Sequence, residues 1–193
     1  MSFDETIIHC SAPALCGIKP ANLFSMHESV FSTGKQKIHE WRPYFSKNCK
    51  HFVSLKKADD RVLFFVYDAK LLQQLLSDVH NAHYLAGKGY PVQRGFPAVL
   101  AELLHRLAYN DTFPHEVGLF LGYPLCDVIG FETQQAQGSR YSGFWKVYGD
   151  VNDARRTMEL YKTCSETCMK WLNSGLSVPL AAEKYRFALQ TCK

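Results

Sequence analysis

The strongest periodic pattern in the chain is an apolar stripe between residues 96 and 107. Its members recur at intervals of three and four residues: Phe96, Val99, Leu100, Leu103, Leu104 and Leu107. This spacing places them on one face of an amphipathic helix. A second leucine-rich stripe predicts a helix over Ala69–Leu85. Near the C-terminus, Asp150 or Asn152 can cap a long helix that ends at about Leu172, and Val178–Thr191 predicts a last helix.

Three further helices are predicted from weaker patterns. The first begins near Cys10–Ala12 and ends near Gly17, because Pro13 is tolerated in the first turn of a helix. The second spans Lys35–Phe45, where Pro43 disturbs the pattern. The third is a short helix over Leu125–Phe131.

Four segments predict strands. His51–Lys57 and Arg61–Tyr67 flank a short polar turn and form a hairpin. The second of these is apolar without interruption, so we expect it to be a central strand covered on both faces. Glu116–Leu121 and Gly143–Tyr148 are the other two strands. The sum of about four strands and about six helices predicts an α+β fold with a small, mostly antiparallel sheet.

No pattern divides the chain into parts. There is no internal repeat, no low-complexity tract and no linker, and the Gly- and Ser-rich stretch at 134–143 is typical of one exposed loop. A length of 193 residues suits one domain with a full hydrophobic core. We therefore expect residues 1–193 to form a single domain.

The net charge and the composition argue against some classes of function. The net charge is +4 and no long basic run occurs, which argues against a nucleic-acid partner. The longest apolar run, Val62–Tyr67, is too short to span a membrane. The N-terminus lacks the pattern of a signal peptide, so a cytoplasmic location is expected. The seven cysteines are then expected to be reduced thiols.

Three segments carry a resemblance to a known family. They are His9-Cys-Ser-Ala-Pro-Ala-Leu-Cys-Gly-Ile-Lys-Pro-Ala-Asn-Leu-Phe24, Pro114-His-Glu-Val-Gly-Leu-Phe-Leu-Gly-Tyr-Pro-Leu-Cys-Asp-Val-Ile-Gly-Phe131 and Gly143-Phe-Trp-Lys-Val-Tyr-Gly-Asp150. With them, the chain resembles domain-of-unknown-function family 3793, uncharacterised proteins of anaerobic bacteria. Cys10, His115 and Asp127 fall on its motif positions, whereas Cys16 and Cys126 depart from them. The resemblance implies no activity, cofactor or mechanism.

One hypothesis is cysteine-dependent acyl transfer or amide hydrolysis. Cys10 at a helix start would have a lowered pKa, and His115 at a strand start could serve as its base. Asp127 would orient the imidazole, with Glu116 or Asp150 as alternatives, in a layout resembling that of papain. Cys16 is an alternative to Cys10 as the reactive thiol.

The competing hypothesis is a non-catalytic protein that binds a small ligand or a partner in an aromatic pocket near Trp145 and Tyr148. Whether the chain is an enzyme stays open between the two. Cys164 and Cys168 lie one helical turn apart and could contribute to a metal site, but a closed zinc site needs four ligands, so packing is favoured. The glycines at 118, 122 and 130 match no nucleotide-binding motif. We therefore predict neither a metal nor a cofactor.

Overall fold

The computed structural model describes residues 1–56, 59–110 and 112–191. The chain divides into two compact units. The first consists of Met1–Leu71 together with the chain from Glu159 onward, and the second is Leu72–Met158. The expected organisation as a single domain stays a prediction.

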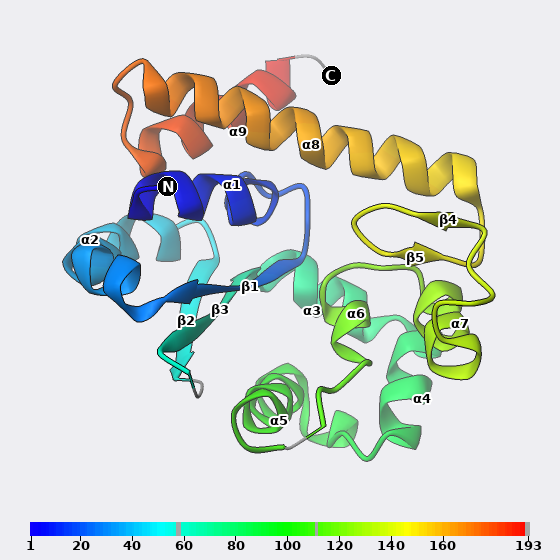
Figure 1. Ribbon diagram of the computed structural model, residues 1–193. Helices are drawn as coiled ribbons and strands as arrows, with labels where there is room; N and C mark the ends of the chain where they lie inside the picture. The colour runs from blue at the N-terminus through cyan, green and yellow to red at the C-terminus, as the bar shows by residue number, and fades with distance from the viewer. Residues whose placement is uncertain (57–58, 111, 192–193) are drawn as a thin grey trace. The chain divides into compact units, whose positions relative to one another are not determined.

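The first unit contains a three-stranded antiparallel sheet. Its strands are β1 (Ala21–His27), β2 (Lys50–Lys56) and β3 (Arg61–Asp68), in the order β1-β3-β2 (Figure 1). The predicted hairpin of β2 and β3 is confirmed, and so is the central position of β3. Four of its apolar side chains are almost fully buried: Val62, Phe64, Phe65 and Val66. The strand β1 was not predicted.

Helical segments complete the first unit: the two nearest the N-terminus pack on the sheet, and the last helix packs against those two. They are α1 (Phe3–Leu15), α2 (Glu28–Ser46), the C-terminal part of α8 (Val151–Asn173) and α9 (Val178–Thr191). The helices α1 and α9 lie side by side (Figure 1). One hydrophobic core joins residues from the sheet to residues from both ends of the chain. The bounds of α9 are those that the sequence predicted.

The first helix begins seven residues earlier than predicted. Ser2 and Glu5 form a capping box, in which the Ser2 hydroxyl accepts from the Glu5 N–H and the Glu5 carboxylate accepts from the Ser2 N–H. This cap starts α1 at Phe3, so Pro13 lies in its last turn. Gly17, with φ of +76°, ends the helix after Cys16. The predicted start near Cys10–Ala12 is therefore wrong.

A close contact between α1 and α2 depends on Gly34. A Cβ at this position would lie 2.0 Å from the Phe3 ring, which is buried and stacks on Trp41. We expect Gly34→Ala to lower the free energy of unfolding by about 1–3 kcal/mol, because the ring must move out of its place. Gly87→Ala is the matched control, since its Cβ would meet nothing within 4 Å. Urea denaturation of both variants checks this; equal stability of the two would contradict it.

The second unit is built from short helices. Its elements are most of α3 (Ala69–Ser77), α4 (Val79–Gly87), the 3-10 helix η1 (Val92–Arg94), α5 (Phe96–Tyr109), α6 (Val117–Phe120), α7 (Leu125–Gln134), the strands β4 (Tyr141–Ser142) and β5 (Lys146–Val147), and the start of α8. The strongly periodic α5 is confirmed. The single helix predicted over Ala69–Leu85 is two helices, because Asp78 caps α4 through the N–H groups of His80 and Asn81.

Two predicted strands of the second unit are wrong or shortened. Residues 116–121 contain the short helix α6 with its two caps, with bonds such as Leu119 N–H to the Glu116 carbonyl, rather than a strand. Gly143–Tyr148 contributes only the two residues of β5, paired with β4. The ladder ends there because the N–H groups of Tyr148 and Gly149 donate to the Asp127 carboxylate instead of to a neighbouring strand.

The fold class is α+β with a small antiparallel sheet, as predicted. Within the described residues there are nine α-helices and five strands in two sheets, against an expectation of about six and four. No helix in this part of the chain is both long enough and apolar enough to cross a membrane.

Candidate functional site

Cys10 lies in the middle of a helix rather than at its start. It is the eighth residue of the 13-residue α1, and its side chain is half-buried. Burial raises the pKa of the Cys10 thiol. The lowered pKa that a helix N-terminus would provide therefore has no basis at this position.

His115 lies in the turn before α6 and is exposed. The edge of its ring faces the ring of Phe131 at 5.2 Å between centroids. The neighbouring Glu116 is buried and accepts hydrogen bonds from the Tyr90 hydroxyl at 3.0 Å and from Arg106 at 2.9 Å. Glu116 thus anchors the turn that carries His115, and its carboxylate is already engaged.

Asp127 lies in the first turn of α7, as predicted, and is buried. Its carboxylate accepts from the Trp145 indole and from the N–H groups of Tyr148 and Gly149, each at 2.8 Å. These three hydrogen bonds attach the residues on both sides of β5 to the first turn of α7. The alternative orienting group, Asp150, is exposed and caps α8 through the N–H groups of Asn152 and Asp153.

The three predicted catalytic residues are divided between the two units. Cys10 belongs to the first, and His115 and Asp127 belong to the second. Their convergence stays a prediction. Two of the local arguments behind it are corrected, since Cys10 does not open a helix and His115 does not open a strand.

The aromatic residues around β5 pack against the protein itself. Trp145 is buried and stacks on Tyr123 with ring centroids 4.8 Å apart. The Tyr148 ring lies against Gly130, where a Cβ would be only 2.4 Å away. These contacts account for Trp145 and Tyr148 without a ligand.

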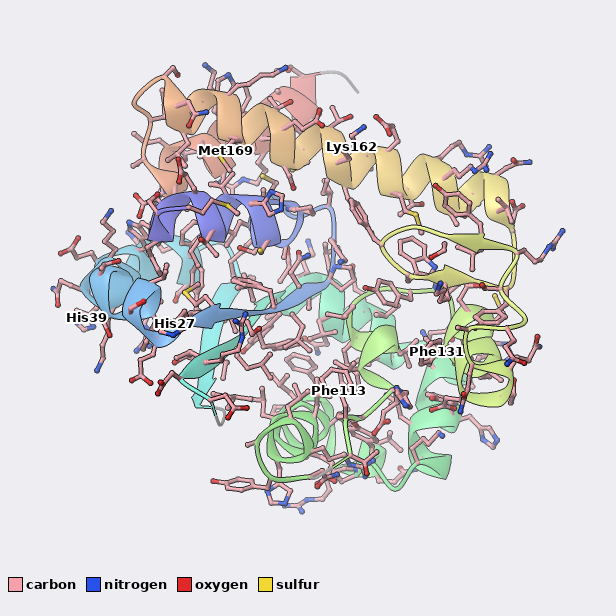
Figure 2. The ribbon with its side chains drawn as sticks, in the orientation of Figure 1. His27, His39, Phe113, Phe131, Lys162 and Met169 are labelled. Atoms are coloured by element: carbon pink, nitrogen blue, oxygen red, sulfur yellow. The ribbon has the colours of Figure 1, made fainter. Side chains whose placement is uncertain are left out.

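A cluster of three thiols stands out in the first unit. Cys16 is the C-cap of α1, and Cys164 and Cys168 lie one turn apart on α8, where Figure 2 labels the adjacent Met169. The three sulfur atoms lie within 4.8 Å of one another, and the Sγ atoms of Cys16 and Cys168 are 3.6 Å apart. We call this cluster the three-thiol centre.

The three-thiol centre is sealed from solvent. Cys16 is 1% exposed, and Cys164 and Cys168 are 0% exposed. Hydrogen bonds from Cys16 and then Cys164 lower the pKa of Cys168, whereas hydrogen bonds with the other two thiols raise the pKa of Cys16. Because each sulfur lies beside two others in a buried site, a thiolate on one of them disfavours the loss of a proton from the others.

The helix α9 supplies the outer contacts of the three-thiol centre. Burial, and then the neighbouring Cys164, raise the pKa of the Tyr185 hydroxyl, and the Ala181 carbonyl lies 3.9 Å from the Cys168 sulfur. Tyr185 packs edge-on against Trp171. Partners of this kind fix the orientation of ligand side chains in metal sites.

A buried cation lies near the same two chain segments. Lys19 follows Cys16 by three residues and is 5% exposed, and burial lowers its pKa to about 8. Its Nζ lies 5.3 Å from the centroid of the Tyr161 ring. Tyr161 precedes Cys164 by one helical turn, so the two side chains share a face of α8.

Sequence reasoning found only part of the three-thiol centre. The one-turn spacing of Cys164 and Cys168 was visible, but Cys16 lies 152 residues before Cys168. Nothing local to Cys16 marks it as their neighbour. The sequence offered one indication of the contact. The segment that ends with Cys16 and the segment that contains Cys164 and Cys168 each have an apolar face that must be buried.

Comparisons with known proteins identify the family. No curated protein and no solved structure matches the chain. The sequence profile described as "Protein of unknown function (DUF3793)" matches residues 7–180, which agrees with the resemblance carried by the three motif segments. The match covers most of the chain and both of its units. The chain is therefore a member of the DUF3793 family.

Proposed function

We propose that the protein binds a thiophilic metal ion of the Cu(I) type through Cys16, Cys164 and Cys168. The observation that carries this proposal is the convergence of three free thiols from two distant segments. An ion about 2.3 Å from each of three sulfurs requires sulfur atoms about 4 Å apart. The spacing in the three-thiol centre needs only small side-chain adjustments to meet this requirement.

The number and type of ligands favour Cu(I) over zinc. Thiolates are soft ligands that suit Cu(I) and zinc, but structural zinc sites are closed by four protein ligands. Within the described residues, no His, Asp or Glu side chain joins the three cysteines. A zinc site completed by water is disfavoured because the centre is sealed from solvent. Three soft ligands in a dry pocket suit a trigonal Cu(I) ion.

The net charge of the metal-bound centre must be compensated by its surroundings. Three thiolates around a monovalent ion carry a net charge of −2, which is costly to bury without compensation. The buried Lys19 ammonium, near the end of α1 and against α8, supplies a positive charge in this region. Because a cysteine binds a metal as the thiolate, binding should release protons from the thiols that are protonated in the metal-free protein.

The test is a titration of the fully reduced protein with Cu(I), in the absence of oxygen, against a chromogenic Cu(I) chelator. We expect one tightly bound equivalent with sulfur neighbours at about 2.2–2.3 Å in X-ray absorption. Cys164→Ala and Cys168→Ala should each weaken binding by at least about 100-fold, which exceeds the usual effect of removing an outer partner. Cys49→Ser is the matched control, since Cys49 is an exposed thiol outside the centre.

Three results would contradict the proposal. One is wild-type binding no tighter than that of the Cys164→Ala variant. Another is an equal loss from Cys49→Ser. The third is zinc bound with four protein ligands. Circular dichroism of the metal-free variants keeps a folding defect distinct from the loss of a ligand.

A further inference from the structure

A groove separates α2 from the edge strand β2 in the first unit. Its volume is about 490 Å³, which lies within the usual range for small-molecule sites. It is lined by Phe31, Ser32, Lys35, Gln36, Ile38, His39, Arg42 and Ser54. We call it the α2 groove. Figure 2 labels His39, whose side chain is exposed on α2.

The basic side chains of the α2 groove follow one face of the helix. Lys35, His39 and Arg42 are spaced by four and three residues, so they lie in a row. With a rise of 1.5 Å per residue, the row from Lys35 to Arg42 is about 10 Å long. None of the residues that line the groove is acidic.

The cations of this row have no carboxylate partner in the part of the chain that the structure describes. The neighbouring Lys37 is paired with Asp4 at 2.8 Å, and Lys50 is paired with Asp68 at 2.6 Å. Lys35 and Arg42 make no such pair within 4.0 Å among the described residues. Gathering unpaired positive charges is unfavourable unless an anion offsets them.

The rest of the lining indicates the kind of anion. The exposed Gln36 amide and the Ser54 hydroxyl can donate to phosphate oxygens, whereas the Ser32 hydroxyl already donates to the Glu28 carbonyl. The buried Ile38 and the half-buried Phe31 add an apolar wall. Charges spread over about 10 Å suit several linked phosphates better than a single one.

We propose that the α2 groove binds a small organic polyphosphate, with its phosphates along Lys35, His39 and Arg42 and its organic group against Phe31 and Ile38. This site is separate from the three-thiol centre and does not depend on metal binding. Arg42 can form paired hydrogen bonds with one phosphate, and Lys35 contributes a point charge at the other end of the row.

The test uses two probes, ATP and inorganic tripolyphosphate, in isothermal titration calorimetry at physiological ionic strength. We expect ATP to bind and Lys35→Gln/Arg42→Gln to weaken it by at least about tenfold, the effect of about 1.4 kcal/mol. The control, Lys162→Gln/Lys170→Gln, removes the same charge from exposed positions on α8 and should change affinity less than about twofold.

Each other outcome overturns part or all of the assignment. Equal losses in the two double variants mean that ATP responds only to net charge, and the groove is then no site. Absence of wild-type binding at millimolar ATP has the same consequence. If tripolyphosphate binds as tightly as ATP, the apolar wall contributes nothing to binding, and that part of the proposal is wrong. Thermal unfolding of both double variants verifies that each is folded during the titration.

Discussion

The Asp127→Ala variant is expected to lose about 3–5 kcal/mol of its free energy of unfolding. The carboxylate is 3% exposed and accepts three hydrogen bonds, two from backbone N–H groups and one from the Trp145 indole. Without it, the Trp145 indole and the N–H groups of Tyr148 and Gly149 lose their shared acceptor. Each unsatisfied buried donor costs about 1–3 kcal/mol.

Two further variants make this prediction specific. Asp127→Asn keeps the shape but directs an amide N–H₂ group at one of the donors, so an intermediate loss is expected. Asp150→Ala removes an exposed carboxylate that only caps α8, and a much smaller loss is expected. Urea denaturation followed by circular dichroism orders the three variants. If Asp127→Ala is no less stable than Asp150→Ala, Asp127 does not hold the loop.

The second large effect concerns the ion pair of Lys50 and Asp68. Their side chains are 7% and 5% exposed, and Nζ lies 2.6 Å from Oδ2. We expect Asp68→Asn to lower the free energy of unfolding by about 3–5 kcal/mol, because a buried ammonium loses its counter-charge. The asparagine oxygen can still accept from the N–H groups of Lys70 and Leu71, which Asp68 caps.

A double variant separates the charge from the cap. Adding Lys50→Met to Asp68→Asn removes the unpaired ammonium while it keeps the apolar stem, so most of the lost stability should return. Chemical denaturation of both single variants and the double variant gives the coupling energy. If the two single losses simply add, the ion pair contributes nothing beyond its separate side chains, and the prediction fails.

The sequence predicted most reliably the elements whose own pattern decides their structure. The periodic α5 and the uninterrupted apolar run of β3 agree with the structure. Prediction failed where contacts with a distant part of the chain determine the secondary structure. The pattern of residues 116–121 predicts a strand. In the structure, the Glu116 carboxylate accepts from Tyr90 and Arg106, and the segment contains the helix α6. The strand β1 pairs with β3, and its weak alternation gave little local signal.

The candidate sites follow the same rule. The sequence pattern predicts a helix start at Cys10, whereas the capping box at Ser2 places that start at Phe3. The three-thiol centre needs Cys16 beside α8, which only the tertiary fold provides. The α2 groove is lined by residues of both α2 and β2, so the sequence pattern of either element alone does not predict it.

The discontinuous first unit has a consequence for the order of folding during synthesis. Residues 72–158 form one contiguous segment, whereas the first unit combines the chain up to Leu71 with the chain from Glu159 onward. Until that segment emerges, α1 lacks its contacts with α9, and the core that contains Ile7, Ile8, Val178 and Tyr185 is incomplete. The nascent chain therefore exposes part of the apolar face of α1 until α9 has been synthesised, and exposed apolar surface of this kind favours aggregation.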